Sequence, residues 1–163
     1  MIIVIVEGPS DAGFIEGLAR RLEIRCKVLL MRGNRPRKAV RLVKLGHFNT
    51  PEKVVVLKDV HRRSESDVKE NLREIVQELG GIAHGVIVKR SIESWVLAGL
   101  GVKNAEDISD PVRELSSRMI RERGMPYLKS KDLLRRLARE IDLDAAARNS
   151  QTFKGFLELL QDD

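Results

Sequence analysis

Acidic residues follow three apolar runs of this sequence at positions that suit metal-dependent chemistry. Glu7 comes directly after "IIVIV", with Asp11 four residues later; Asp59 follows "VVVLK", and Glu93 lies beyond the run that ends "GVIV". If these runs are neighbouring parallel strands, their carboxyl ends meet at one edge of a sheet. Four carboxylates there repel one another unless a divalent cation binds, and their hard oxygen atoms suit Mg²⁺ or Mn²⁺. The pattern therefore predicts a metal site.

A purely structural role is an alternative for some of these acidic residues. Asp11 and Glu93, taken singly, are typical of the first turn of a helix, where a negative charge is favourable and Ser10 would be the N-cap of the first helix. Glu7 and Asp59 directly follow buried strands, and neither is needed to start a helix. The metal-site prediction is supported by the fact that both of these residues follow buried strands.

The elements that must position these residues are predicted from hydrophobic patterning. Four short runs rich in Val and Ile predict strands at residues 2–6, 24–31, 53–57 and 82–88. The first and third are continuously apolar, which indicates strands of a parallel sheet that is covered on both faces. Helical patterns, "DAGFIEGLARRL" and "SDVKENLREIVQELGG", lie between strands. The order predicts an α/β fold with a mainly parallel four-stranded sheet sandwiched by helices.

The second half of the chain is predicted to be helical. Helical stretches are expected at residues 91–100, 110–123, 129–141 and 150–161. With 163 residues, of which 42% are hydrophobic, we expect one domain. It would have an α/β core in residues 1–90 and a helical layer in residues 91–163. No run approaches the ~20 apolar residues of a membrane span, so we expect a cytoplasmic protein without a membrane partner.

The positive charge of the chain is concentrated in one segment. Residues 32–51 carry six Lys or Arg and no acidic residue, which leaves 24 basic against 24 acidic residues in the rest of the chain. A localised basic segment favours a polyanionic partner, although a solvated helix face in a heat-adapted protein has the same composition. The expected nucleic-acid contacts are Arg32, Arg35, Arg37, Lys38, Arg41 and Lys44, with Arg62 and Arg63 beside the acidic loop.

Several other function classes are not indicated by the sequence. The turn "EGPSDAG" lacks the G-x-x-x-x-G-K-[ST] pattern of a P-loop, so ATP hydrolysis by this chain is not expected. Aromatic residues make up only 4% of the chain, which disfavours a stacking platform for single strands. The single cysteine, Cys26, excludes a disulfide and a cysteine zinc site. Trp95, on an apolar helix face, is expected in the core.

Three motifs together resemble the Toprim superfamily, the Mg²⁺-dependent domain of type IA and II topoisomerases, bacterial primases and OLD-family nucleases. They are "IVIVEGPSD", "VVVLKDVH" and "IESWVLAGL". The greatest likeness is to small stand-alone Toprim-like proteins related to the OLD nuclease domain, in which E-G-x-[ST]-[DE] and E-x-W-x-L-A motifs recur. The tail from "YLKSKDLLRRLAREIDLD" onward also looks like the end of that group. The resemblance thus covers most of the chain.

This resemblance implies a Toprim-like, Rossmann-like fold and metal-dependent phosphodiester chemistry. Glu7 would be a metal ligand that also handles a proton, and Asp59 would be the first aspartate of the D-x-D pair. Asp11 and Glu93 would complete a second metal position, so that two cations could activate water and neutralise the scissile phosphate. Lys89 is a third catalytic candidate. The resemblance also implies DNA or RNA as partner, a separate partner ATPase, and a role in DNA repair or phage defence.

One position departs from the pattern of the family. His61 stands where the second aspartate of D-x-D is usual, and imidazole is a poor ligand for Mg²⁺ but a fair one for Mn²⁺ or Zn²⁺. His61 is included among the metal-ligand candidates. Three interpretations stay open: a changed metal preference, a weakened second site in a protein that binds nucleic acid without cutting it, or an exposed loop histidine without a role.

The leading prediction from the sequence is therefore a Toprim-type nuclease that uses Mg²⁺ or Mn²⁺. One alternative is a non-catalytic nucleic-acid-binding or assembly module with a residual acidic site. Another is a small-molecule phosphotransferase on the same scaffold, because a fold does not fix the substrate. For phosphate contacts near the acidic loops, Lys58, Lys89 and Arg90 are further candidates beside Arg62 and Arg63.

Overall fold

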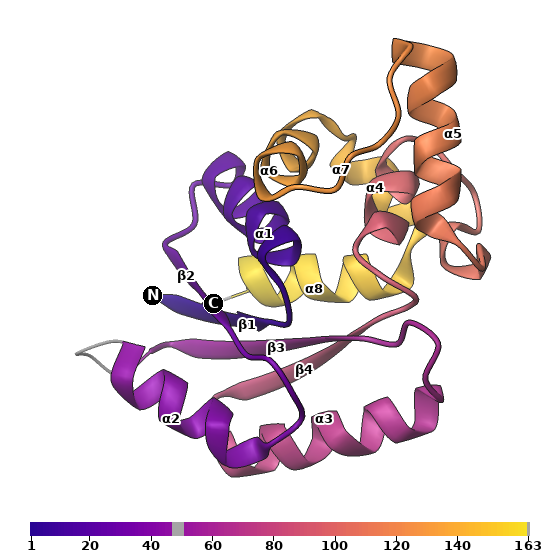
Figure 1. Ribbon diagram of the computed structural model, residues 1–163. Helices are drawn as coiled ribbons and strands as arrows, with labels where there is room; N and C mark the ends of the chain where they lie inside the picture. Colours follow the sequence, from indigo (N-terminus) through magenta and orange to yellow (C-terminus); the bar gives the residue numbers. More distant parts are fainter. Residues whose placement is uncertain (47–50, 163) are drawn as a thin grey trace.

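A computed structural model describes residues 1–46 and 51–162 of the chain. At its centre is a four-stranded sheet in the order β2-β1-β3-β4, in which every neighbouring pair is parallel (Figure 1). The strands are β1 (Ile2–Val6), β2 (Cys26–Leu30), β3 (Lys53–Asp59) and β4 (Ala83–Val88). The four predicted strands and the parallel α/β architecture are confirmed.

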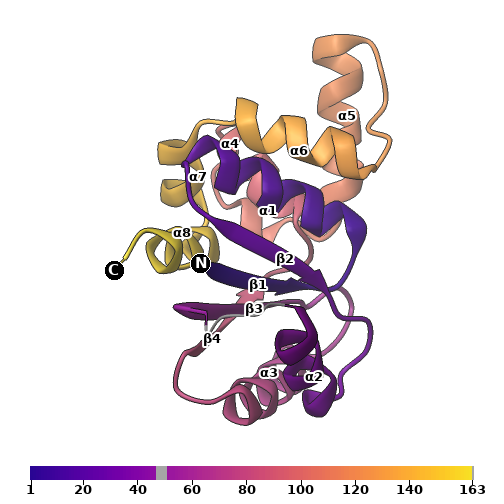
Figure 2. The same ribbon diagram turned by 90° about the vertical axis from the view of Figure 1, so that its left-hand side faces the viewer.

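Helices cover both faces of the sheet (Figures 1 and 2). They are α1 (Pro9–Arg21), α2 (Pro36–Gly46), α3 (Glu65–Leu79), α4 (Glu93–Gly99), α5 (Pro111–Arg123), α6 (Lys131–Glu140), α7 (Leu143–Asn149) and α8 (Gln151–Gln161), with a 3₁₀ turn at Ala105–Asp107. Helices α2 and α3 lie on one face, and α1 and α8 lie on the other with α4, α6 and α7 stacked beyond them. The helical C-terminal part is confirmed, although α7 was not predicted. Among the described residues, no helix combines the length and apolarity that crossing a membrane requires.

Strand β1 shows why its sequence is continuously apolar. Ile2, Val4 and Val6 belong to the larger core, which α1, α4, α6 and α8 complete. Ile3 and Ile5 belong to the smaller core on the side of α2 and α3. Successive side chains of a strand point to opposite faces, so both sets must be apolar when both faces are covered. The larger core also holds Trp95, which is fully buried, as predicted.

The strand that carries the aspartate is longer than predicted. Strand β3 extends to Asp59 rather than ending at Leu57, and Asp59 still pairs with Val88 of β4. Lys58 and Asp59 are therefore held by the sheet itself and not by a loop. Because β3 extends this far, the hydrogen bonds of the sheet fix the backbone position of Asp59.

Helices α1 and α6 approach closely at glycines of α1. A Cβ atom built at Gly13 would overlap the backbone carbonyl oxygen of Lys131, and one built at Gly17 would overlap that of Arg135. Backbone atoms cannot move aside as a flexible side chain can. The close approach brings the start of α6 against the first half of α1, the helix that carries Asp11.

We expect Gly13→Ala to lower the free energy of unfolding by about 1–3 kcal/mol, the usual cost of overpacking. The helix propensity of alanine offsets only part of this cost. Gly155→Ala in α8 is the matched control, because a Cβ atom there meets nothing within 4 Å; it should stabilise the protein by about 0.5–1 kcal/mol. Urea denaturation measures both values. Equal effects of the two substitutions would show that the contact between α1 and α6 is looser than the structure indicates.

Candidate metal centre at the carboxyl edge of the sheet

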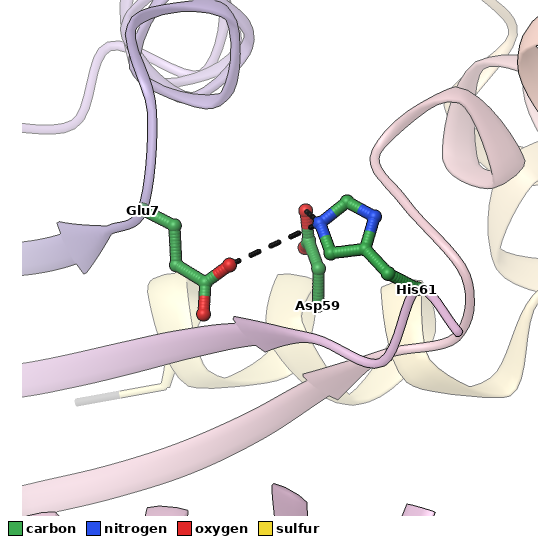
Figure 3. Close-up of side chains that lie close together, drawn as sticks. All are labelled: Glu7, Asp59 and His61. Carbon is green, nitrogen blue, oxygen red and sulfur yellow. Dashed lines mark ion pairs between the residues drawn. The ribbon is translucent and has the colours of Figure 1, made fainter. Parts of the chain in front are cut away.

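Three side chains meet at the carboxyl ends of β1 and β3, which are neighbours in the sheet. Glu7 follows β1 directly, Asp59 is the last residue of β3, and His61 lies two residues beyond it. Each offers one ligand atom, and these atoms all lie within 4.8 Å of one another (Figure 3). The predicted meeting of Glu7 and Asp59 at one edge of the sheet is therefore what the structure shows.

His61 is oriented toward the two carboxylates. Its Nε2 atom lies 3.3 Å from Oδ2 of Asp59 and 4.0 Å from Oε2 of Glu7 (Figure 3). The hydrogen bond to Asp59 raises the pKa of His61, while partial burial opposes the rise. Its backbone is in the left-handed region (φ 49°), and its N–H donates to the carbonyl of Arg90 at 2.8 Å. The structure thus places His61 in the cluster with Glu7 and Asp59.

Two cationic side chains hold the other oxygen of Glu7. Nζ of Lys58 lies 3.2 Å from Oε1 of Glu7, and Nη2 of Arg63 lies 3.4 Å from the same atom. Arg63 also donates to the carbonyl of Asp59 at 2.6 Å. Consequently Oε1 faces protein cations, whereas Oε2 faces His61 and the interior of the cluster. With Oε1 held by these cations, Glu7 would bind a metal ion through Oε2.

Lys58 is almost completely buried, at 1% exposure. Burial lowers the pKa of its ammonium group, and the neighbouring Glu7 opposes that shift. The ammonium also donates to the carbonyl of Gly33 and to Oδ1 of Asn34, at 3.0 and 3.1 Å. Lys58 thereby connects Glu7 to the first turn of the basic segment. The sequence suggested Lys58 as an auxiliary phosphate contact, but its ammonium is turned inward to Glu7.

Asp11 lies at the third position of α1. Its Oδ2 accepts a hydrogen bond from the backbone N–H of Gly8 at 3.1 Å, and Gly8 is the N-cap. The expectation that Ser10 is the N-cap was therefore wrong, because the helix begins earlier, at Pro9. Burial first, and then the charge of Asp59, raise the pKa of Asp11 to about 7. Its buried Oδ1 has no hydrogen-bond partner among the described residues, so this oxygen keeps its capacity to accept a hydrogen bond or bind a cation.

Glu93 is fully buried at the start of α4. The hydroxyl of Tyr127 donates to its Oε2 at 3.3 Å, and Nζ of Lys129 lies 3.5 Å from its Oε1. Burial, and next the charge of Glu93, raise the pKa of Tyr127. Glu93 also helps to raise the pKa values of Asp11 and Asp59, so it adds to the same negative field. Its carboxylate is stabilised by Tyr127 and Lys129, neither of which was predicted.

The remaining catalytic candidate, Lys89, lies apart from these contacts. It is half-buried after β4 and lines a cavity of about 330 Å³ with Glu106 and Asp107. In residues 1–46 and 51–162, no hydrogen bond or ion pair joins Lys89 to Glu7 or Asp59. Its catalytic role stays a prediction.

The basic segment begins at the cluster and then leads away from it. The basic residues along this segment are all exposed: Arg32, Arg35, Arg37, Lys38, Arg41 and Lys44. The hydrogen bonds from Lys58 hold the turn at Gly33 and Asn34 at the carboxyl edge, and α2 then runs toward the opposite edge of the sheet (Figure 1). Residues 47–50 lie outside the described part of the chain. The start of the segment is therefore nearer to the acidic cluster than its end.

The donors of the cluster fit a divalent cation. Glu7 and Asp59 supply carboxylate oxygens and His61 supplies an imidazole nitrogen, within 4.8 Å of one another. The buried Oδ1 of Asp11 has no partner in the described residues. Burial and the negative neighbours raise the pKa of Asp59, because they make its charged form unfavourable. A bound cation would stabilise that charged form. The arrangement could hold a metal ion.

Comparison with known proteins supports the fold. No protein-family model and no curated protein matches this sequence. Among solved structures, the C-terminal region of the Burkholderia pseudomallei OLD protein matches with a TM-score of 0.55 and 16% identity, and the alignment covers 99% of this chain and 97% of that one. At this identity the likeness shows the fold alone. The chain has the fold of the C-terminal OLD region, as its resemblance to Toprim-like proteins of the OLD group predicted.

Proposed function

We propose that this chain is a metal-dependent nuclease of the Toprim type. The observation that carries the proposal is the cluster of Glu7, Asp59 and His61, whose ligand atoms lie within 4.8 Å of one another. The cluster lies beyond the carboxyl ends of parallel strands, where ligands bind in open α/β sheets. The basic residues nearby favour a polyanionic substrate. The fold similarity to the C-terminal region of an OLD protein agrees with the resemblance of the sequence motifs to the OLD group.

The donor set favours Mn²⁺ over Mg²⁺. Glu7, Asp59 and His61 would hold the cation, and the free Oδ1 of Asp11 would extend the site. Imidazole suits Mn²⁺ better than Mg²⁺, which prefers oxygen ligands alone. When bound, such a cation lowers the pKa of a water nucleophile and neutralises charge on a phosphate.

The side chains of this chain have separate tasks around that cation. Lys58 and Arg63 fix Oε1 of Glu7, so that Oε2 is presented to the cluster. The half-exposed guanidinium of Arg63 is also placed to donate to a phosphate oxygen. Lys129, paired with Glu93 inside the site, can stabilise negative charge that develops on the phosphate. The residues at the start of the basic segment would hold flanking phosphates.

Cleavage assays test the proposal directly. Labelled single- and double-stranded DNA and RNA are incubated with the protein in Mg²⁺, Mn²⁺ or EDTA. We expect cleavage of at least one substrate, faster in Mn²⁺ than in Mg²⁺, and none in EDTA. If no substrate is cut under any condition and calorimetry detects no metal binding, the proposal is wrong.

A second candidate function is a nucleic-acid-binding module without catalysis. The observation that favours it is the pairing of protein cations with the acids, Lys58 with Glu7 and Lys129 with Glu93, which compensates their charge without a metal. This candidate predicts binding with a steep salt dependence that Glu7→Gln leaves unchanged, and no cleavage. The nuclease proposal predicts cleavage that Glu7→Gln strongly reduces.

We expect His61→Asp to shift the metal preference toward Mg²⁺. The substitution replaces an imidazole with a hard oxygen ligand, so the ratio of the Mn²⁺ rate to the Mg²⁺ rate should fall by about 10-fold, the usual scale for a change in the ligand environment. Rates in each metal, measured at saturating concentration, give the ratio. An unchanged ratio would mean that His61 is not a ligand. His84→Asp on β4, away from the cluster, is the control.

A further inference from the structure

A second cavity of about 420 Å³ lies beside the acidic cluster. His61 contributes to both, because it is a member of the cluster and also lines this cavity. The other lining residues come from the loops after β3 and β4 and from the start of α5: Arg62, Arg63, Arg90, Ser91, Ser109, Asp110, Pro111 and Val112. The cavity is therefore built at the same edge of the sheet as the cluster.

Basic residues outnumber acidic ones around this cavity. It is lined by three arginines and by one residue with a carboxylate, Asp110. That carboxylate is the N-cap of α5 and accepts the backbone N–H of Arg113 at 3.1 Å. Among the residues that the structure describes, no carboxylate forms an ion pair with Arg62 or Arg90. Arg63 shares its guanidinium with Glu7, whereas Arg62 and Arg90 have no such partner in the described part of the chain and are available to an anion.

The arginine-bearing loops are fixed rather than free. Arg90 and His61 both have left-handed backbones, with φ values of 67° and 49°. Such conformations are unfavourable for residues with a side chain and persist where the surrounding structure holds them, often at functional sites. Here the hydrogen bond from the N–H of His61 to the carbonyl of Arg90 joins the two loops, and Val60 bonds to Val88 just before it. The structure thus stabilises a fixed relative position of Arg62 and Arg90.

One further feature suits an anion. Ser91 is 5% exposed, and its hydroxyl has no hydrogen-bond partner within the described ranges. A buried hydroxyl without a protein partner is rare and is usually satisfied by water or a ligand. Arginine side chains and serine hydroxyls are common donors to phosphate oxygens.

We propose that this cavity is a phosphate subsite, in which Arg62, Arg90 and Ser91 bind a phosphate group of the strand whose neighbouring phosphate lies at the acidic cluster. The proposal rests on the proposed function for the identity of the substrate. The phosphate is either internal to the strand or a 5′-terminal group, since both present the same oxygens to the arginines. A single site next to the cluster would set the register of the strand relative to the metal.

Binding in EDTA tests the subsite separately from catalysis. Fluorescence anisotropy is measured with a short single-stranded oligonucleotide that carries a 5′-phosphate and with one that carries a 5′-hydroxyl. We expect Arg90→Gln and Arg62→Gln each to weaken binding by about 10-fold, the scale of one lost charged hydrogen bond, and Arg90→Lys to recover part of the loss. Arg121→Gln, an exposed arginine farther along α5, is the matched control and should have an effect below about 2-fold.

The outcomes separate the two proposals. If Arg90→Gln weakens only the 5′-phosphorylated probe, the cavity binds a terminal phosphate; if it weakens both probes, it binds an internal one. Equal effects of Arg90→Gln and Arg121→Gln would overturn the subsite, even if the wild type cleaves. A specific loss with Arg90→Gln in a protein that cuts nothing would leave the subsite in place and overturn the nuclease.

Discussion

Replacing Glu7 with glutamine is expected to lower the cleavage rate by about 10³-fold, because a metal ligand supplies several kcal/mol of transition-state stabilisation. Glutamine keeps the shape of the side chain, and its amide oxygen can still accept hydrogen bonds from Lys58 and Arg63. It has no charge with which to bind a cation. The same substitution should therefore abolish Mn²⁺ binding in calorimetry.

The fold must be shown to survive this substitution. Lys58 is buried, and removing the charge of its partner destabilises a buried ion pair. The carbonyl of Gly33 and Oδ1 of Asn34 remain as acceptors for its ammonium group, so we expect a lower melting temperature but a cooperative transition. Glu70→Gln on the exposed face of α3 is the control and should leave turnover unchanged. Full turnover by Glu7→Gln would contradict a ligand role for Glu7.

The part of this site that could be predicted is the part that depends on strand ends. Glu7 and Asp59 each end an apolar run, and parallel strands bring their carboxyl ends together whatever the order of the strands. The sequence therefore predicted their meeting without any knowledge of the helices. His61 lies near the two carboxylates because it follows Asp59 by two residues in the sequence. Its direction toward Asp59 depends on the left-handed backbone at His61, which no residue type in "DVHRR" signals.

The residues that escaped prediction are those placed by helix packing. Tyr127 and Lys129 are 34 and 36 residues from Glu93 in sequence, and they reach it because the loop before α6 is held against α1. That contact depends on Gly13 and Gly17, whose lack of a side chain signals a close approach but not its partner. In the sequence, the segment "YLKSKD" contributes only to the resemblance to the OLD group. No spacing rule connects it to Glu93.

The position of Lys58 differs from the prediction for another reason. A lysine at the end of an apolar run is usually the first exposed residue after a strand, and so a phosphate contact is the natural prediction for it. The extension of β3 to Asp59 instead keeps Lys58 inside the sheet. Its burial depends on partners that are distant in sequence, chiefly Glu7 at the end of the neighbouring strand, because a buried cation needs a partner. The burial of Lys58 and the orientation of Glu7 therefore depend on the ion pair between them.

Replacing Asp11 with asparagine is expected to stabilise the metal-free protein at alkaline pH. The pKa of Asp11 is raised from 3.8 to about 7, so the folded protein holds a proton that the unfolded chain has already released. Stability therefore falls as pH rises from about 4 to about 7 and stays low above that range. Asparagine carries no charge, and its oxygen can still accept the N–H of Gly8. At about pH 8 the substitution should add on the order of 3 kcal/mol to the free energy of unfolding.

Thermal and urea unfolding in EDTA measure this difference, which should disappear below about pH 4, where both states of the wild type are protonated. Mn²⁺ should reverse the order at alkaline pH. The wild type would gain stability from a cation that offsets the charge of Asp11, whereas Asp11→Asn would gain less. A substitution that destabilises the protein in EDTA at alkaline pH would show that Asp11 serves α1 as a cap and not the cluster. The sign of one stability difference, with and without the metal, thus distinguishes a helix-capping aspartate from a metal ligand.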